Sequence, residues 1–165
     1  DLAHIERVMA VNFWGVVLTT KAFLPHLLRR REACVVNVSS MGALAPVPGQ
    51  SAYGASKAAV TLLTEGLYAE MRDTSVAVTV VFPGGVATDI AGNSGASIPG
   101  GVTTNEAPTS LTSPRDAARA IIDGAERGAF RVVIGRDARA IDILFRLSPR
   151  RATDLVAKKM ASLLG

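Results

Sequence analysis

The first part of the chain alternates apolar and polar positions with a helical period. This spacing predicts one long amphipathic helix over residues 2–30, in which Pro25 either introduces a kink or marks the last turns. A second long helix is expected over 51–72. The apolar positions that carry the first prediction are Ile5, Val8, Met9, Phe13, Val16, Val17, Phe23, Leu24, Leu27 and Leu28.

Three short segments are apolar on both faces, which is typical of strands in a parallel sheet covered by helices on both sides. The first of them is expected to be a central strand. A further helix is expected at "SPRDAARAIIDGAERG", with Ser113 as its N-cap and Gly128 at its end. The three strand segments are "CVVNVSS" (34–40), "VAVTVVF" (76–82) and "RVVIG" (131–135).

Helices and strands therefore alternate along the chain. This order predicts an α/β fold with a doubly wound, three-layer parallel sheet joined by right-handed crossovers. Residues 89–113 are rich in small and polar residues and are expected to form a loop over the substrate. Residues 137–165 are expected to form a C-terminal tail of two helical segments broken at Pro149. The length of 165 residues suits one domain, 1–165.

The composition indicates a folded protein. Hydrophobic residues make up 48% of the chain and charged residues 19%, which supports a buried core and argues against disorder. No uninterrupted apolar run is long enough to span a membrane, and Cys34 is expected to be a buried thiol of an intracellular protein. A cytoplasmic location is therefore expected. The chain begins with Asp1 and shows no signal-peptide pattern, which suggests a fragment.

The positive charge is concentrated at the C-terminal end. Residues 127–165 hold nine arginines and lysines against three aspartates, while the whole chain carries +4. Too few aromatic residues interleave with these charges for a nucleic-acid surface. The amphipathic basic tail could contact a membrane surface. A solvated helix over the substrate cleft is the favoured interpretation.

The segment "SAYGASKAAV" (51–60) places a phenol and an ammonium four residues apart among small side chains. On the helix predicted here, Tyr53 and Lys57 lie on nearly the same face. A free tyrosine has a pKa of about 10, and a nearby ammonium stabilises the phenolate, which makes the phenol a better general acid or base near neutrality. Alone, such a pair is more often a solvated surface pair.

Other polar residues converge on the same place. Ligands bind at the carboxyl ends of the strands in such sheets. Ser39 and Ser40 end the first strand, and "PGGVAT" follows the second and ends in Thr88. Asn12 lies within the long first helix between apolar neighbours, and a buried asparagine needs hydrogen-bond partners. His4 and His26 have no partners at metal-ligand spacing, so no metal site is expected.

The motifs "VNFWG", "VVNVSS", "YGASK" and "PGGVATD" occur in the order found in short-chain dehydrogenases/reductases. Nearly the whole chain resembles the C-terminal portion of that family. The resemblance implies an oxidoreductase that interconverts a secondary alcohol and a carbonyl with NAD or NADP. It also implies a partial Rossmann-like sheet whose N-terminal strands and glycine-rich phosphate-binding turn are missing. The first strand of this chain would then lose a parallel neighbour and expose an edge.

The resemblance implies a role for each matching residue. Tyr53 exchanges the proton with the substrate oxygen, and Lys57 assists it and hydrogen-bonds the nicotinamide ribose. Ser40, thirteen residues before Tyr53, orients the substrate oxygen, and Asn12 holds a water that relays protons from Lys57. The residues expected to contact the nicotinamide end are Pro83, Gly84, Val86 and Thr88.

Each role has a structural alternative. Asn12 could merely satisfy backbone groups, Ser40 could be a strand-end cap, and Thr88 could cap the segment after it. The resemblance further implies a homodimer or homotetramer in which helices 2–30 and 51–72 pair with their copies.

Two other function classes remain open. Extended-type epimerases and dehydratases share the Tyr–Lys pair, but only about 75 residues follow Thr88, which is short for their substrate portion. A truncated chain could instead act as a non-catalytic interaction module through its two long helices. The choice between NAD and NADP is not readable, because its determinant would lie before Asp1.

Overall fold

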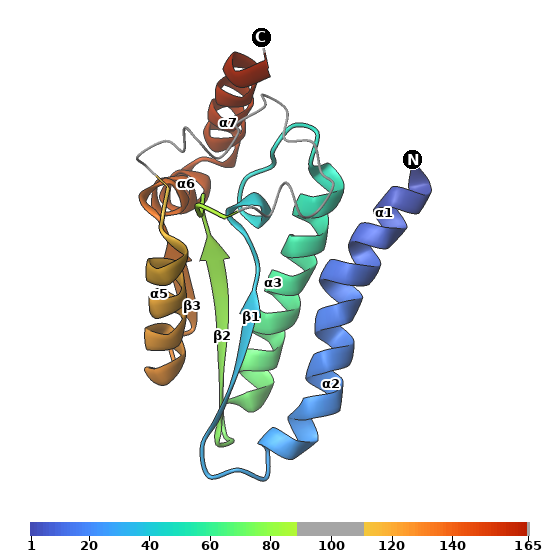
Figure 1. The fold of residues 1–165 in the computed structure, drawn as a ribbon, viewed down its shortest axis with the longest axis vertical. Coiled ribbons are helices and arrows are strands. Elements are labelled where there is room, and N and C mark those ends of the chain that lie inside the picture. Colours follow the sequence, from blue (N-terminus) through green and yellow to red (C-terminus); the bar gives the residue numbers. More distant parts are fainter. Residues whose placement is uncertain (89–110, 165) are drawn as a thin grey trace.

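The computed structural model describes residues 1–88 and 111–164 (Figure 1). A long helix opens the chain, and a short π-helical segment in its middle separates two α-helical segments. The elements in chain order are α1 (Leu2–Met9), the π-helix η1 (Ala10–Trp14), α2 (Gly15–Leu27), β1 (Ala33–Val38), the 3₁₀ turn η2 (Met41–Ala43), α3 (Ser51–Met71), β2 (Val76–Pro83), α5 (Pro114–Glu126), β3 (Arg131–Ile134), α6 (Arg136–Leu147) and α7 (Pro149–Leu164).

The described strands form one parallel sheet in the order β1-β2-β3. Figure 1 shows α3 and the long α1–α2 helix on one side of this sheet and α5 on the other. The α/β fold class and the partial, Rossmann-like parallel sheet are confirmed. In the described sheet β2 is central and β1 has an open outer edge, as expected for a partial sheet in which the first strand has lost a parallel neighbour.

Sequence signals set most of the helix boundaries. The Ser113 hydroxyl accepts the N–H of Asp116 at 3.1 Å, so it caps α5 as predicted. Gly128 follows α5 with a positive φ of 59°, a conformation that favours glycine. Helices α6 and α7 meet at Ser148, and Pro149 begins α7, where its missing N–H costs nothing.

The buried core lies on both faces of β2. On one face Val76 and Val78 pack with Leu67 of α3, and on the other Val81 packs with Ala117 of α5. Phe82 is fully buried near the end of the strand. Because this strand is covered on both faces, its carboxyl end is held firmly where the chain turns out toward the predicted site.

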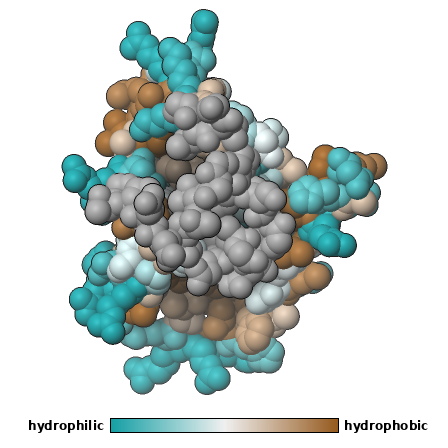
Figure 2. All heavy atoms as spheres, turned by 45° about the horizontal axis from the view of Figure 1, so that its top comes forward, coloured by the Kyte–Doolittle hydropathy of each residue, from teal (hydrophilic) through white to brown (hydrophobic). Residues whose placement is uncertain are grey.

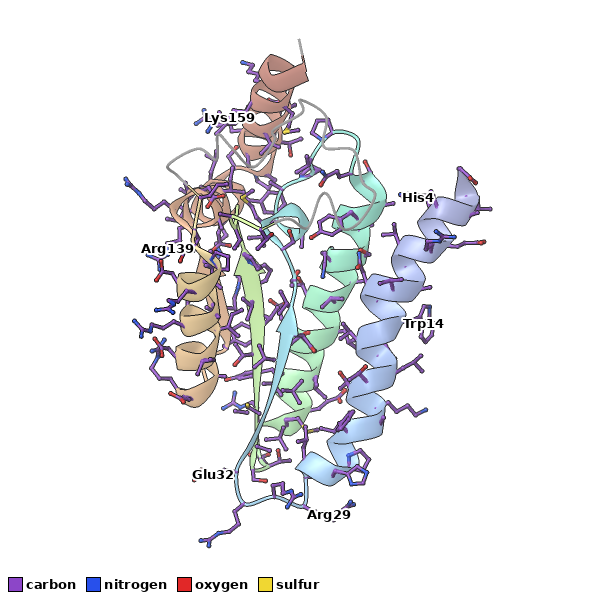
Figure 3. The ribbon with its side chains drawn as sticks, in the orientation of Figure 1. His4, Trp14, Arg29, Glu32, Arg139 and Lys159 are labelled. Atoms are coloured by element: carbon purple, nitrogen blue, oxygen red, sulfur yellow. The ribbon has the colours of Figure 1, made fainter. Side chains whose placement is uncertain are left out.

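The α1–α2 helix is far more exposed than an amphipathic core helix would be. None of its residues is buried, and Trp14 and Leu18 are 53% and 62% exposed. Trp14 points away from the rest of the molecule (Figure 3), and hydrophobic side chains reach the surface on this side (Figure 2). A monomer rarely leaves such an apolar surface open to water.

The structure bears on two expectations drawn from composition. Leu2–Leu27 has an 18-residue window of mean hydropathy 1.3, so by length and composition it could cross a membrane, although polar residues interrupt its apolar runs. A helix that packs against another protein surface passes the same test. Cys34, predicted to be buried, is exposed, because it lies on the open edge strand β1.

Candidate active site

Tyr53 and Lys57 lie one turn apart on α3, as predicted. The Lys57 Nζ is 6.0 Å from the centre of the Tyr53 ring and donates a hydrogen bond to the Val38 carbonyl at 3.0 Å. Both side chains are half-buried. Burial lowers the pKa of the Lys57 ammonium below its usual value of 10.5, because a charged group loses hydration there. The bond to Val38 uses one of the three hydrogens of the Lys57 ammonium, so the ammonium can still donate hydrogen bonds to a ligand.

Ser40 borders the same space as Tyr53. Its Oγ accepts the N–H of Gly42 at 3.0 Å and thereby caps the short turn η2. A Cβ added to Gly42 would lie 3.5 Å from Ser40 Oγ and 3.5 Å from Tyr53 Cε1. The capping role considered for Ser40 is therefore present. Its hydroxyl hydrogen has no acceptor within the described part of the chain and can serve a ligand.

Gly54 lets α3 approach this turn closely. A Cβ at this position would lie 2.9 Å from the Gly42 carbonyl oxygen, a distance that real side chains essentially never show. The residue directly after Tyr53 therefore has to be glycine for η2, and with it Ser40, to lie against the helix.

We expect Gly54→Ala to destabilise the protein by roughly 1–3 kcal/mol, because the added methyl forces η2 away from α3. The matched control is Gly66→Ala on the same helix, where a Cβ meets nothing within 4 Å. That substitution should stabilise by roughly 0.5–1 kcal/mol through helix propensity. Urea unfolding of both variants measures the difference. Equal free energies of unfolding would show that the close approach is not needed.

Ser39 fastens the end of β1 to the turn of α3 that carries Lys57. Its buried hydroxyl bonds the Lys57 carbonyl oxygen at 2.9 Å and Thr61 Oγ1 at 2.8 Å, and its N–H bonds the Val81 carbonyl in β2 at 2.8 Å. The strand end and the helix are thus held together by hydrogen bonds. This fixes the Val38 carbonyl within reach of the Lys57 ammonium.

Asn12 lies in the π-helical segment η1, where the wide turn interrupts two α-helical segments. Such turns are frequent at functional sites. The Asn12 amide donates to Ser56 Oγ at 3.0 Å, and Ser56 Oγ donates to the Tyr53 carbonyl at 2.7 Å. Asn12 is thus joined to the Tyr53 turn of α3 through Ser56. The side-chain carbonyl oxygen of Asn12 accepts no hydrogen bond from any described residue.

The turn after β2 carries the remaining predicted residues. Gly84 N–H donates to the Ile134 carbonyl at 2.8 Å, and Val86 forms a parallel bridge with Thr112. Thr88 is exposed, and its N–H donates to the Val86 carbonyl at 2.9 Å. Whether Thr88 caps a following segment falls outside the described residues, as does the predicted loop 89–113 except for its last three positions.

The model of the family described as short chain dehydrogenase matches residues 1–98, more than half of the chain. The chain belongs to the short-chain dehydrogenase family. A Mycobacterium tuberculosis relative named "Putative oxidoreductase SadH" is 42% identical over 98% of this chain and 60% of its own length. Human 17-beta-hydroxysteroid dehydrogenase type 2 is 47% identical over 56% of this chain and 24% of its own length. The chain thus spans about 60% of the first of these relatives.

Solved short-chain dehydrogenases have the same fold. One from Burkholderia cenocepacia, in complex with NADP, superposes with a TM-score of 0.78 at 26% identity, covering 94% of this chain and 60% of that one. One from Streptomyces avermitilis gives 0.74 at 27% identity, covering 92% and 59%. The family's oxidoreductase character and the partial extent of this chain are therefore both established.

The side chains of this short-chain dehydrogenase fit a nicotinamide and its ribose. The Tyr53 hydroxyl and the Thr88 side chain have no partner among the described residues, and Lys57 keeps two unused donors. These groups come from α3 and from the turn after β2, next to the Ser40 cap. The dinucleotide phosphates would need donors that lie elsewhere, since the described helix α3 begins at Ser51 with no phosphate-binding glycine turn before it.

Sequence reasoning missed several supporting residues. Ser56 was counted only as a small neighbour, yet it is fully buried and links Asn12 to the Tyr53 carbonyl. The sequence places Ser39 at the end of the first strand, but the bond of its hydroxyl to the Lys57 carbonyl and the close approach at Gly54 involve the backbone of α3, which no motif spacing reveals. A buried hydroxyl within a small-residue helix face was the available signal, because a buried polar group requires a partner.

Proposed function

We propose that this chain is the catalytic part of an NAD(P)-dependent oxidoreductase that interconverts a secondary alcohol and a carbonyl compound. The observation that carries the proposal is the convergence of Tyr53, Lys57 and Ser40 beside the turn after β2. The cofactor supplies and accepts the hydride, and the side chains described here manage the proton and the orientation of the substrate.

Tyr53 and Lys57 form the acid–base pair of the proposed mechanism. In reduction, the Tyr53 hydroxyl donates its proton to the substrate oxygen, and in oxidation its phenolate takes the alcohol proton. The Lys57 ammonium stabilises that phenolate, since it lies beside the ring in a partly buried site where charges interact strongly. Ser40 donates its unused hydroxyl hydrogen to the substrate oxygen and orients it.

Asn12 has a positioning and relay role in this proposal. Its amide is committed to Ser56, and its free carbonyl oxygen accepts a hydrogen bond from a water that connects Lys57 with solvent. The support is the open π-helical turn and the unused acceptor. The nicotinamide end of the cofactor contacts Pro83, Gly84, Val86 and Thr88, whose backbone the glycines leave accessible.

The rest of the proposed cofactor site belongs to polypeptide beyond this chain. A groove of about 450 Å³ runs between α2 and the open edge of β1, lined in part by Val16, Thr19 and Val35. An open edge strand is prone to pair with further strand. We propose that the phosphate-binding half of the sheet docks here, and that it decides between NAD and NADP.

The assay that tests the function compares the 165-residue chain with the full-length gene product. We expect the full-length protein to reduce ketones with NADH or NADPH, and the isolated chain to bind either cofactor at least about 100-fold more weakly, since it lacks a phosphate-binding turn. Cofactor fluorescence and absorbance at 340 nm measure both properties. Micromolar binding with turnover by the isolated chain, or no turnover with any ketone by the full-length protein, would contradict the proposal.

The other function classes predict different results in that assay. An extended-type epimerase or dehydratase would hold its cofactor tightly and turn over nucleotide sugars with no net change at 340 nm. A non-catalytic interaction module would show no turnover and would depend on the two long helices alone. The buried hydrogen bonds that hold Lys57, Ser39 and Asn12 in place favour the enzyme, because an interaction module does not need them.

The exposed face of the α1–α2 helix supports a homodimer or homotetramer. Val11, Trp14, Leu18 and Phe23 are each more than half exposed on it. We propose that this helix and α3 pair with their copies in a second subunit, which would remove this apolar surface from water. Analytical ultracentrifugation would then return at least twice the mass of one chain, and a monomer would contradict the pairing.

For the basic tail, we propose a solvated helix pair beside the substrate cleft in a cytoplasmic enzyme. Asp142 forms ion pairs with Arg131 at 3.2 Å and with Arg146 at 3.1 Å. The first pair joins α6 to β3, and both pairs offset part of the positive charge of this region. Sedimentation with anionic liposomes tests the rival interpretation, a membrane-surface contact. Binding that depends on residues 137–165 would support the membrane contact instead.

A further inference from the structure

We propose that Asp137 is a positioning residue that holds the turn after β2 in the shape that receives the nicotinamide end of the cofactor. The inference rests on the proposed function. It adds a residue from the opposite end of the chain to the site, 53 positions beyond Gly84 in sequence but in direct contact with the turn.

The Asp137 carboxylate is exposed on one side and lies against the backbone of two loops on the other. Its Oδ2 accepts the N–H of Gly85 at 2.7 Å, a short hydrogen bond of the kind that a charged acceptor makes. A Cβ added to Gly84 would overlap both carboxylate oxygens, and one added to Gly135 would overlap Oδ1. Two glycines, Gly84 and Gly135, therefore leave the space that this one carboxylate occupies.

Asp137 makes the only side-chain hydrogen bond to this turn among the described residues. The remaining bonds join backbone groups: Gly84 N–H to the Ile134 carbonyl, Thr112 N–H to the Gly85 carbonyl and Ala87 N–H to the Thr112 carbonyl. Asp137 lies in the first turn of α6, where the helix dipole favours an anion. Helix α6, the first helix of the basic tail, is thus fastened to the turn between β2 and Thr88.

This contact constrains a glycine pair that would otherwise be flexible. Two consecutive glycines have a wide choice of backbone conformations, so an unfastened turn would lose more freedom when a cofactor binds. A turn already held by Asp137 has lost much of that freedom beforehand, which favours binding. The expected signature is therefore in cofactor affinity and KM, with a smaller effect on kcat.

The test uses the full-length protein with five variants, three here and two in the mutant cycle below, and it measures the cofactor-free and the cofactor-bound state. In Asp137→Ala, we expect the Gly85 amide to exchange with solvent about tenfold faster without cofactor, and the cofactor Kd and KM to rise about tenfold, through the loss of a hydrogen bond to a charged group. Asp137→Asn keeps an acceptor oxygen, so it should recover most of the Gly85 protection from exchange and most of the cofactor affinity. Asp154→Ala, which removes an exposed carboxylate on α7, is the matched control and should change neither.

A double-mutant cycle isolates the contact. Gly84→Ala alone should weaken cofactor binding, because its methyl displaces the carboxylate. The same change in Asp137→Ala should cost far less, because the space is already free. Additive effects of the two substitutions would overturn the positioning role of Asp137. An unchanged Gly85 exchange rate in Asp137→Ala would overturn it as well.

The outcomes separate this inference from the proposed function. Faster Gly85 exchange with unchanged Kd and KM would mean that Asp137 stabilises only the fold, and it would overturn the positioning role. If the wild-type protein binds neither NADH nor NADPH, the proposed function fails and the positioning role fails with it. In that case, Gly85 exchange still shows whether the contact itself exists.

Discussion

Tyr53→Phe in the full-length enzyme is expected to lower kcat by about 10³-fold or more in both directions, because the phenol proposed to exchange a proton with the substrate oxygen is removed. The phenyl ring keeps its packing beside Gly42, so the fold and the cofactor Kd should change little. Steady-state rates with a ketone substrate and cofactor fluorescence titration measure the two quantities separately.

The chain contains a matched control for this substitution. Tyr68, the second of its two tyrosines, is also half-buried on α3, but it lies toward the opposite end of the helix from Tyr53, where its ring centre is 4.6 Å from that of Phe130 and the two rings are tilted by 56°. Tyr68→Phe should leave kcat unchanged. Turnover retained by Tyr53→Phe, or lost equally in both variants, would remove Tyr53 from the proton-transfer step.

Lys57→Met is expected to lower kcat/KM by about 10²-fold, because the phenolate of Tyr53 loses its neighbouring charge. The substitution also removes a donor to the cofactor ribose, so KM for the cofactor should rise. Methionine has similar length and fits the same half-buried path without a charge.

The pH dependence of the wild-type enzyme provides a second readout of Lys57. Burial lowers the pKa of its ammonium below 10.5, so raising the pH removes this charge earlier than for a free lysine. The oxidation rate should therefore fall at alkaline pH, and that falling limb should be absent in Lys57→Met. The exposed Lys21 provides a control: Lys21→Met should keep the falling limb. Identical profiles for wild type and Lys57→Met would contradict the assigned role.

The predicted elements and the observed ones agree best where local signals are strong. The helix over 51–72 is observed at Ser51–Met71, and the Ser113 cap and the Gly128 stop are both present. Such signals depend on a few neighbouring residues, so the sequence alone carries them. The π-helical turn at Ala10–Trp14 was not predicted, because one extra residue in a turn leaves little trace in the apolar spacing.

The wrong expectation of a buried Cys34 has an identifiable cause. The Val-rich pattern of β1 and the apolar surroundings of Cys34 indicate a strand that is covered on all sides, which predicts a buried thiol. The described sheet leaves the outer edge of β1 open. The residue pattern of a strand indicates the environment that suits it. Whether the strand is buried depends on which other strands are present beside it.

The sequence by itself determined the α/β order, the approximate limits of the helices and strands, and the Tyr53–Lys57 pair, because each of these depends on periodicity or on spacing within one helix. Only the tertiary structure decided which distant groups support that pair. The Val38 carbonyl near Lys57, Ser56 between Asn12 and Tyr53, and Asp137 at Gly85 are contacts across 19, 44 and 52 positions. Such contacts depend on how closely backbones approach one another, and that distance is set by packing of the whole sheet and its helices.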